Sequence, residues 1–270
     1  MNKGKFFKSF DNTKIWYKYI KGKKTCLVFL HGLTGSSSAW RPFYPDLQKK
    51  GHAILLIDIR GHGLSDKPSG NEKYTLENAS KDLYYLLCVL KIKKIILIGH
   101  CYGGMISQLF YEKNPDYVKK IILINTHYNF SSNIFRYVSS WLVYFIYYFM
   151  SFLLYPLHFE KNHVHLNYTK FRISHDLSLK RLYEDIRATS FRTFLPFTKN
   201  TLHVNFTSIL KKIKVPVLIL HGKKDLIIPV RVAHEMKNLI KTSTLKILDT
   251  NHVSVINVPE EILSEITNFL

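Results

Sequence analysis

Short apolar runs alternate along most of the chain with stretches whose apolar residues recur at helical spacing. Buried strands produce the first pattern and amphipathic helices produce the second. The expected strands are 5–10, 14–20, 26–30, 53–57, 95–98, 120–125, 217–220 and 245–248, and the expected helices are 40–49, 76–90, 103–113 and one that begins near 259. This alternation predicts an α/β fold with a mostly parallel central sheet flanked by helices.

The alternation breaks between residues 126 and 208, which are aromatic-rich and helix-like. We therefore expect an α/β core made of 1–125 and 209–270, with 126–208 inserted as a helical cap. Within it, residues 137–157 carry no charge and are nearly as long as a membrane span of about 20 residues. A span at this point would divide the sheet between two sides of a bilayer, so it is not expected. Two alternatives stay open, a lid over an apolar pocket and a surface that docks on membranes. The candidate substrate contacts are Trp141, Phe145 and Tyr148.

Length and composition narrow the class of protein. A chain of 270 residues, 46% of them hydrophobic, is long enough to bury a large core as one domain. The formal net charge of +20 comes from lysines scattered over nearly every segment, with no nucleic-acid-binding motif, so we expect no nucleic-acid partner. That charge would suit peripheral contact with an anionic membrane surface.

Three cysteines cannot all pair with one another, which favours a reducing compartment. The first ten residues also lack the apolar core of a signal peptide. We expect a cytoplasmic protein.

Candidate chemistry falls where the expected strands end, the place at which open α/β sheets bind their ligands. The motifs are HGLTG at 31–35, DIRGHGLSDKP at 58–68, GHCYGG at 99–104, HGKKD at 221–225 and NH at 251–252. Because GHCYGG directly follows an apolar run, it predicts a nucleophile elbow, a tight strand-to-helix turn that exposes one side chain. That side chain is Cys101, a thiol where serine is usual.

In this order the five motifs resemble those of the α/β-hydrolase family, over nearly the whole chain outside the cap. The resemblance implies a triad in which Cys101 is the nucleophile, His252 the base and Asp225 the acid that orients the imidazole. It also implies an oxyanion hole formed by the backbone N–H groups of Leu33 and Tyr102.

Two further groups of side chains compete for functional roles. Asp249 is a second carboxylate near His252, and we expect it to close a strand instead. The histidines at 158, 163, 165 and 175 have no accompanying cysteine or acidic motif with zinc-site spacing, so we expect no metal and no cofactor.

A cysteine at the elbow is similar to the arrangement in dienelactone hydrolases, and the GHCYGG box is locally similar to that of polyhydroxyalkanoate synthases. An inert cysteine would indicate a lost enzyme, whereas the retained Asp225 and His252 favour a working thiol. We expect cleavage of a small-molecule carboxylic ester or thioester with a hydrophobic acyl group through an acyl-cysteine intermediate. The alternatives are a cysteine-dependent acyltransferase and a noncatalytic lipid-binding or membrane-associated protein on the same fold.

Overall fold

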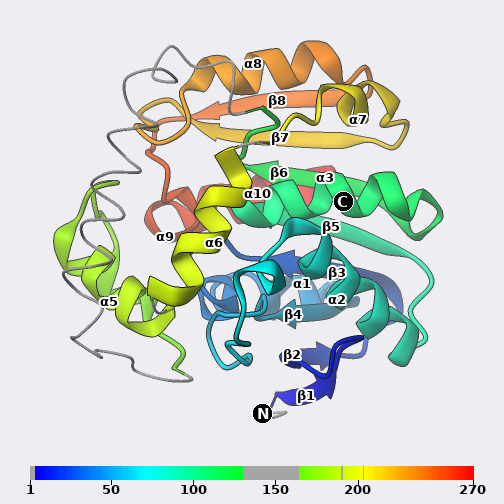
Figure 1. The fold of residues 1–270 in the computed structure, drawn as a ribbon. Helices are drawn as coiled ribbons and strands as arrows, with labels where there is room; N and C mark the ends of the chain where they lie inside the picture. The colour runs from blue at the N-terminus through cyan, green and yellow to red at the C-terminus, as the bar shows by residue number, and fades with distance from the viewer. Residues whose placement is uncertain (1–3, 130–163, 190, 203) are drawn as a thin grey trace.

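A computed structural model describes residues 4–129, 164–189, 191–202 and 204–270. Eight strands form one sheet in the order β1-β2-β4-β3-β5-β6-β7-β8 (Figure 1). The strands are β1 (Lys5–Lys8), β2 (Lys14–Ile20), β3 (Lys24–Leu30), β4 (His52–Ile57), β5 (Ile95–His100), β6 (Val118–Ile124), β7 (Val217–Gly222) and β8 (Ser243–Leu248). Strand β2 pairs antiparallel with β1 and β4, and all other pairs are parallel. The expected α/β fold with a mostly parallel sheet is confirmed.

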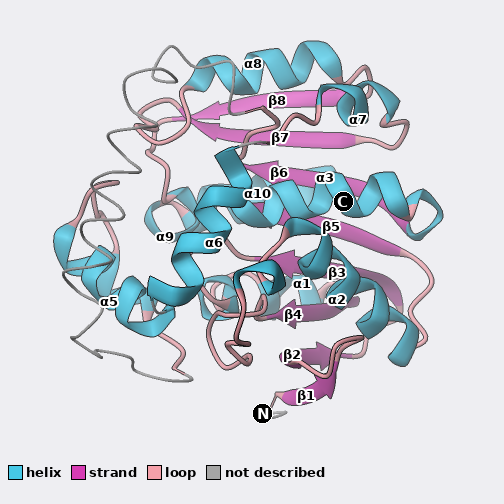
Figure 2. Ribbon diagram, in the orientation of Figure 1, coloured by secondary structure: helices cyan, strands magenta, loops and turns pink. Residues whose placement is uncertain are grey.

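Helices cover both faces of this sheet (Figure 2). The α-helices are α1 (Tyr44–Lys49), α2 (Leu76–Val89), α3 (Tyr102–Lys113), α5 (Leu179–Thr189), α6 (Phe191–Leu202), α7 (Thr207–Lys212), α8 (Val230–Leu239), α9 (Ser254–Asn257) and α10 (Pro259–Phe269). Short 3₁₀ turns occur at η1 (Ser37–Trp40), η2 (Asn71–Lys73), η3 (Pro115–Tyr117) and η6 (Tyr168–Phe171).

Each central strand contributes to two separate hydrophobic clusters because successive side chains point to opposite faces of a sheet. In β3, Val28 packs with α2, α3, α7 and α8, whereas Leu27 and Phe29 pack with α1, α9 and α10. Strands buried on both faces give continuous apolar runs instead of alternating ones. This explains why Ile95–Ile98 is entirely apolar.

The expected elements occur with small shifts in their ends. The largest difference is at 40–49, where the structure has the turn η1 followed by α1 instead of one helix. Pro45 stands at the start of α1, a position that tolerates a missing N–H, whereas proline inside a helix removes a hydrogen bond. Helix α2 begins as expected, since the Thr75 side chain accepts a hydrogen bond from Asn78 N at 3.1 Å.

The insertion predicted as a cap lies between β6 and β7. Its described part contains η6, α5 and α6, and the last two helices lie beyond the carboxyl ends of the strands (Figure 1). The candidate substrate contacts Trp141, Phe145 and Tyr148 fall outside the described residues. The division into a 1–125 and 209–270 core and a 126–208 cap therefore stays a prediction.

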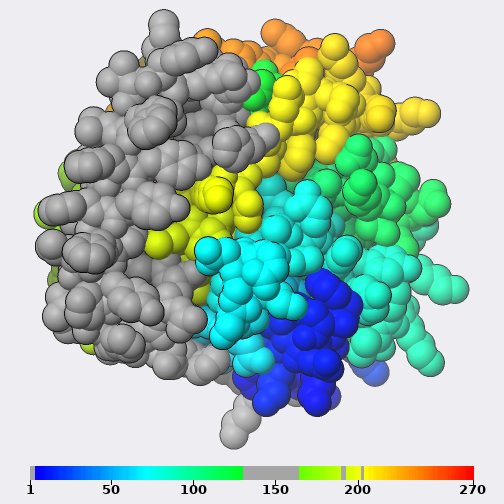
Figure 3. All heavy atoms as spheres, viewed as in Figure 1, coloured from blue at the N-terminus to red at the C-terminus, as the bar shows by residue number. Residues whose placement is uncertain are grey.

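Strands β1 and β2 form a hairpin at one edge of the sheet. This hairpin, blue in Figure 3, lies against the loop after β4, which is cyan. Asp66 N donates to Lys14 O at 2.8 Å, and Lys14 N donates to the Asp66 carboxylate at 2.9 Å. The loop that carries the 58–68 motif is thus fixed by the antiparallel strands. Within the described ranges, no helix has the length and hydropathy needed to cross a bilayer. The cytoplasmic location stays a prediction.

Candidate active site

Cys101 lies at the sharp turn between β5 and α3, with φ 50° and ψ −113°. A non-glycine residue at positive φ is strained, and the surrounding packing must hold it there. Gly103 permits this packing, because a Cβ on it would lie 2.2 Å from the carbonyl oxygen of Leu30 on the neighbouring strand. Cys101 N donates to Ile124 O at 2.9 Å, which ties the turn to β6. The turn has the strained strand-to-helix geometry expected of a nucleophile elbow.

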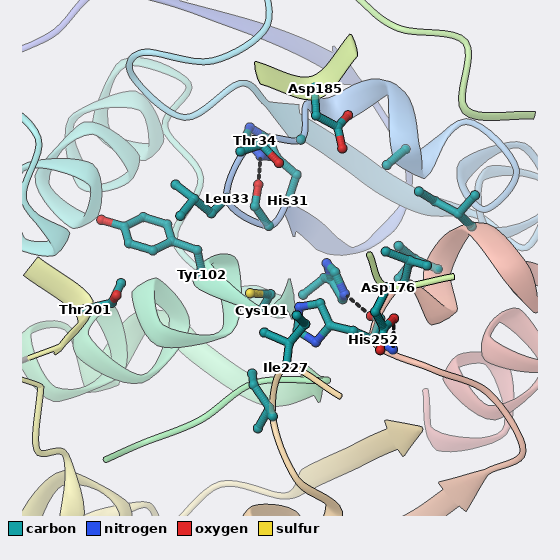
Figure 4. A pocket seen from close by; sticks show the side chains of 18 of the residues that line it. His31, Leu33, Thr34, Cys101, Tyr102, Asp176, Asp185, Thr201, Ile227 and His252 are labelled. Atoms are coloured by element: carbon teal, nitrogen blue, oxygen red, sulfur yellow. Dashed lines mark hydrogen bonds between the residues drawn. The ribbon is translucent and has the colours of Figure 1, made fainter. Parts of the chain in front are cut away.

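His252 and Asp225 meet beside this turn, although they follow different strands. His252 Nδ1 lies 2.9 Å from Asp225 Oδ2, and both side chains are buried. The first lies in the loop after β8 and the second in the loop after β7. Figure 4 shows the Cys101 sulfur near the imidazole of His252, in the same cavity. The structure therefore brings together the three side chains of the predicted triad.

Four hydrogen bonds converge on the Asp225 carboxylate. One is the contact with His252, and the others are donated by Asn125 Nδ2, Ile227 N and Ile228 N, each at 2.8 Å. Burial alone would raise the pKa of Asp225, but hydrogen bonds from His252, Ile228 and Asn125 hold that pKa below its usual range. The carboxylate is therefore ionised at neutral pH and fixed in direction.

The pKa of His252 is raised to about 10 even though burial opposes its charging. The opposing causes are the negative charge of a Cys101 thiolate, hydrogen bonds to Asp225 and Cys101, and the charge of Asp225. An imidazole between two anionic groups is stabilised as imidazolium. The surroundings of the imidazole therefore favour its protonated form.

His100 holds the backbone of His252, the predicted base. Its Nε2 lies 2.9 Å from the carbonyl oxygen of His252, and burial lowers the pKa of His100 to about 3. Because a carbonyl only accepts, the neutral His100 ring must carry its proton on Nε2. His100 therefore holds the loop of His252 and does not itself exchange protons near neutral pH.

The two predicted oxyanion donors lie on either side of the elbow. Tyr102 is the first residue of α3, so its N–H has no partner within that helix. The 31–35 loop approaches the elbow closely, since a Cβ on Gly32 would lie 3.2 Å from the Cβ of Cys101. Among the described residues, neither the Leu33 N–H nor the Tyr102 N–H donates to a protein acceptor. Both groups are free to bind an anionic oxygen of a ligand.

A cavity of about 360 Å³ opens over Cys101, His252 and the two predicted oxyanion residues. Many of its lining side chains are apolar and come from α3, α5, α6, α8 and α9. Examples are Met105, Leu182, Phe194, Val232, Val255 and Ile256. The same wall holds a few buried polar side chains, namely Asp176, Arg181, Asp185 and Thr201. A cavity of this kind suits a ligand that is largely apolar with a few polar atoms.

The competing candidates lie elsewhere. Asp249 follows β8 at the surface and forms an ion pair with Lys224 at 2.8 Å. His165 contacts the buried carboxylate of Asp58, in the loop after β4, at 2.6 Å. In the part of the chain that the structure describes, no three ligand-type side chains gather as a metal site would require. His158 and His163 lie outside that part.

Sequence reasoning missed several residues that build the site. Asn125 bonds the Asp225 carboxylate, and Ser254 in turn donates to the Asn125 amide oxygen at 2.6 Å. Asp176 bonds the backbone of His252. Asn125 was findable as the polar residue that ends an apolar strand beside the elbow, whereas no local pattern marks Asp176.

The eight-stranded, mostly parallel sheet with a strand-to-helix turn at Cys101 is the α/β-hydrolase fold. Comparison with known proteins agrees, since the family described as alpha/beta hydrolase fold matches residues 25–259. The chain belongs to this family.

Its curated relatives include hydrolases of the lipase type. The sn-1-specific diacylglycerol lipase ABHD11 of Danio rerio is 37% identical over 106 residues, which are 39% of this chain and 32% of that protein. Protein ABHD8 of Homo sapiens is 24% identical over 260 residues, 90% of this chain and 54% of that protein. The chain thus spans between about a third and about half of the length of these relatives.

Among solved structures, an esterase from Exiguobacterium antarcticum superposes with a TM-score of 0.79 at 22% identity and covers 99% of each chain. An enol-lactonase from Burkholderia xenovorans superposes with a TM-score of 0.75 at 20% identity, covering 98% of this chain and 99% of that one. At these identities the likeness establishes the fold.

Proposed function

We propose that this protein hydrolyses a small carboxylic ester or thioester with a hydrophobic acyl group, through an acyl intermediate on Cys101. The observation that carries the proposal is the position of the Cys101 thiol, beside an imidazole backed by Asp225 and at the floor of a largely apolar cavity. Relatives whose names denote a lipase and an esterase make ester cleavage the natural reaction class.

In the first half of the reaction, His252 Nε2 takes the proton of the Cys101 thiol while Nδ1–H donates to Asp225. The thiolate sulfur attacks the carbonyl carbon, and the oxygen that becomes negative accepts hydrogen bonds from Leu33 N–H and Tyr102 N–H. When the tetrahedral intermediate collapses, the bond to the leaving oxygen or sulfur breaks. His252 gives its Nε2 proton to that leaving group, and a thioester on Cys101 remains.

In the second half, water takes the place of the leaving group. His252 removes one proton from the water, the resulting hydroxide attacks the thioester carbonyl, and the sulfur–carbon bond breaks. The products are a carboxylic acid and the Cys101 thiolate beside a protonated His252, and return of the Nε2 proton to the sulfur restores the starting thiol and neutral imidazole. Asp225 stays ionised throughout, because its hydrogen bonds favour the carboxylate over the acid.

Acyl transfer uses the same intermediate and differs only in the acceptor. An alcohol or amine that enters in place of water would make the protein an acyltransferase, and the apolar lining, which disfavours water, supports this second candidate.

The decisive experiment is mass spectrometry of the pure protein after incubation with p-nitrophenyl esters and acyl-CoA thioesters of increasing chain length. We expect an acyl adduct on Cys101 and release of free acid with turnover. Cys101→Ala should lose both, and Cys88→Ser is the matched control because Cys88 is an exposed cysteine in the last turn of α2 and does not line the cavity.

The other outcomes separate the alternatives. Release of CoA or p-nitrophenol that requires an added alcohol or amine would replace hydrolysis by acyl transfer. No adduct and no turnover with any ester would contradict both enzymatic proposals and leave a noncatalytic lipid-binding protein. Vesicle binding that a charge at Trp141 or Phe145 abolishes would support membrane contact, independently of the chemistry.

A further inference from the structure

Asp176 joins the two loops that carry Asp225 and His252. Its Oδ1 accepts a hydrogen bond from His252 N at 2.8 Å, and its Oδ2 accepts one from Leu226 N at 2.9 Å. The side chain is buried, with 6% of its surface exposed. Figure 4 shows Asp176 directly beside His252. One carboxylate thus bonds two backbone N–H groups. The first belongs to Leu226, which follows the predicted acid Asp225, and the second belongs to the predicted base His252.

This contact is stronger than an ordinary turn hydrogen bond. Both donors are backbone N–H groups and the acceptor is a carboxylate, and hydrogen bonds to a charged partner are shorter and stronger than neutral ones. The loops after β7 and β8 are joined near their strand ends by Lys223 N to Leu248 O at 2.8 Å and by Lys224 N to Thr250 O at 2.9 Å. Asp176 adds a link from a third segment, farther along both loops, and this link is the one that reaches the backbone of His252 itself.

Asp176 is itself held from the opposite side. Arg181 Nη2 donates to the Asp176 carbonyl oxygen at 2.7 Å, and Arg181 Nη1 donates to Asp185 at 2.8 Å. Both of these side chains line the cavity and are buried. Nearby, Asn251 Nδ2 donates to Ser174 O at 2.8 Å, a second link to the loop of His252. The wall of the cavity and the base loop are therefore one connected hydrogen-bonded unit.

The His252 backbone is fixed at both ends by these contacts. Its N–H donates to Asp176 and its carbonyl accepts from His100, while the ring donates to Asp225. Removal of the first bond would leave the His252 backbone held only at its carbonyl, which gives the ring more freedom to turn away from Cys101. Catalytic groups must stay close to their productive geometry, and small displacements cost large factors in rate.

We propose that Asp176 is a positioning residue that sets the imidazole of His252 against Cys101 and links the cavity wall to the triad. It touches neither sulfur nor imidazole and acts through the backbone of His252 and Leu226. This inference rests on the proposed function only in assuming that His252 activates Cys101.

The test measures the reactivity of Cys101 itself, so that no substrate need be known. The rate of alkylation by iodoacetamide is measured from pH 5.5 to 9 in two proteins. One carries Cys88→Ser alone, and the other carries Cys88→Ser together with Asp176→Asn. The asparagine keeps the size but places an amide against two N–H donors. We expect alkylation at pH 7 to fall about tenfold and the pH profile to move toward that of His252→Ala.

Asp249→Asn is the matched control, since it removes the same charge three positions before His252, at an exposed site paired with Lys224. It should leave the alkylation profile unchanged. The groups that face the imidazole, which are Asp225, His100, His127 and His221, are identical in both variants.

Asp176→Glu restores the carboxylate one methylene further out, so its rate should lie between those of the wild type and Asp176→Asn. Circular dichroism and the melting temperature check that each variant is folded. If Asp176→Asn is not folded, Asp176→Glu is compared with the wild type instead. A wild-type alkylation profile in a folded Asp176 variant, or an equal loss in Asp249→Asn, would overturn the proposal. If Asp176→Asn lowers the alkylation rate of Cys101 but the wild type forms no acyl adduct with any ester, this inference stands and the proposed function is refuted.

Discussion

The two halves of the site are built in different ways. The elbow with Cys101 is held by its backbone, because β5, α3 and the close approach of Gly103 to Leu30 leave the turn one conformation. Asp225 and His252 are held by hydrogen bonds instead. These bonds are made with Asn125, Asp176, His100 and Ile228. The predicted nucleophile is thus placed by steric packing, and the predicted base by hydrogen bonds.

This difference predicts which property a substitution changes in each half of the site. Steric packing tolerates no added atom, so changes at the elbow should act on folding. A hydrogen-bond network can lose one member and keep its shape, so changes on the other side should act on reactivity at nearly constant stability. The following predictions test this division.

The largest effect is expected from Gly103→Ala. The new Cβ would lie 2.2 Å from the Leu30 carbonyl oxygen, a backbone atom that cannot move aside. We expect the free energy of unfolding to fall by roughly 3 kcal/mol or more, measured by urea denaturation. Gly35→Ala, whose Cβ would lie 3.1 Å from its nearest neighbour, should cost less. Equal midpoints for the two variants would show that the elbow is not sterically fixed.

His252→Ala and Asp225→Asn test the polar half. Because both act on the activation of the thiol, we expect the rate of acylation of Cys101 to fall about 10⁴-fold for His252→Ala and about 10³-fold for Asp225→Asn. Quenched-flow mass spectrometry with a p-nitrophenyl ester measures the rate. Wild-type acylation in folded Asp225→Asn would remove the acid from the triad.

Acid should destabilise the protein through its buried neutral histidines. Burial lowers the pKa of His62 and His100 to about 3 and that of His127 to about 4. Unfolded histidine titrates near a pKa of about 6.5, so between these values the unfolded chain binds more protons. The stability that these three histidines contribute is therefore fully present above about pH 6.5 and is lost as pH falls toward 4.

Calorimetry at pH 7, 5.5 and 4 measures this loss as a fall in melting temperature. His100→Gln keeps an amide donor for the His252 carbonyl and cannot be protonated, so its melting temperature should fall less steeply with pH. A slope identical to that of the wild type would show that His100 does not titrate on unfolding.

The smallest effect is expected from Asp249→Asn. This carboxylate is exposed and pairs with a lysine at the surface, and such pairs contribute little to stability. Asp225 is buried, whereas Asp249 is not. We expect unchanged melting temperature and acylation rate, and a clear loss of acylation would make Asp249 a rival to Asp225 as the acid.

Much of the fold was predictable because its signals are local. The apolar run at 95–98 and the glycines that follow it specify a strand and a tight turn within about ten residues. The predicted triad residues likewise occur at strand ends, and the structure places Cys101 and His252 in one cavity, with Asp225 bonded to His252 Nδ1 behind it. Their catalytic roles, with the oxyanion roles of Leu33 and Tyr102, stay predictions that the experiments above address.

The supporting residues were not predictable. Asp176 lies 76 residues from His252 and 50 from Leu226, and nothing in its neighbourhood marks it as a bridge between two loops. A short polar side chain can bond any donor that packing brings near it. Its partner is therefore decided by distant segments.

The sequence by itself determined the order of strands and helices, the turn at Cys101 and the residue types available for acyl chemistry, because each depends on the spacing of nearby residues. Only the tertiary structure decided which carboxylate meets His252, which one fixes its backbone and what lines the cavity over the thiol. The physical reason is that hydrogen bonds and burial join segments far apart in the chain, and they exist only once the sheet has brought the strand ends together.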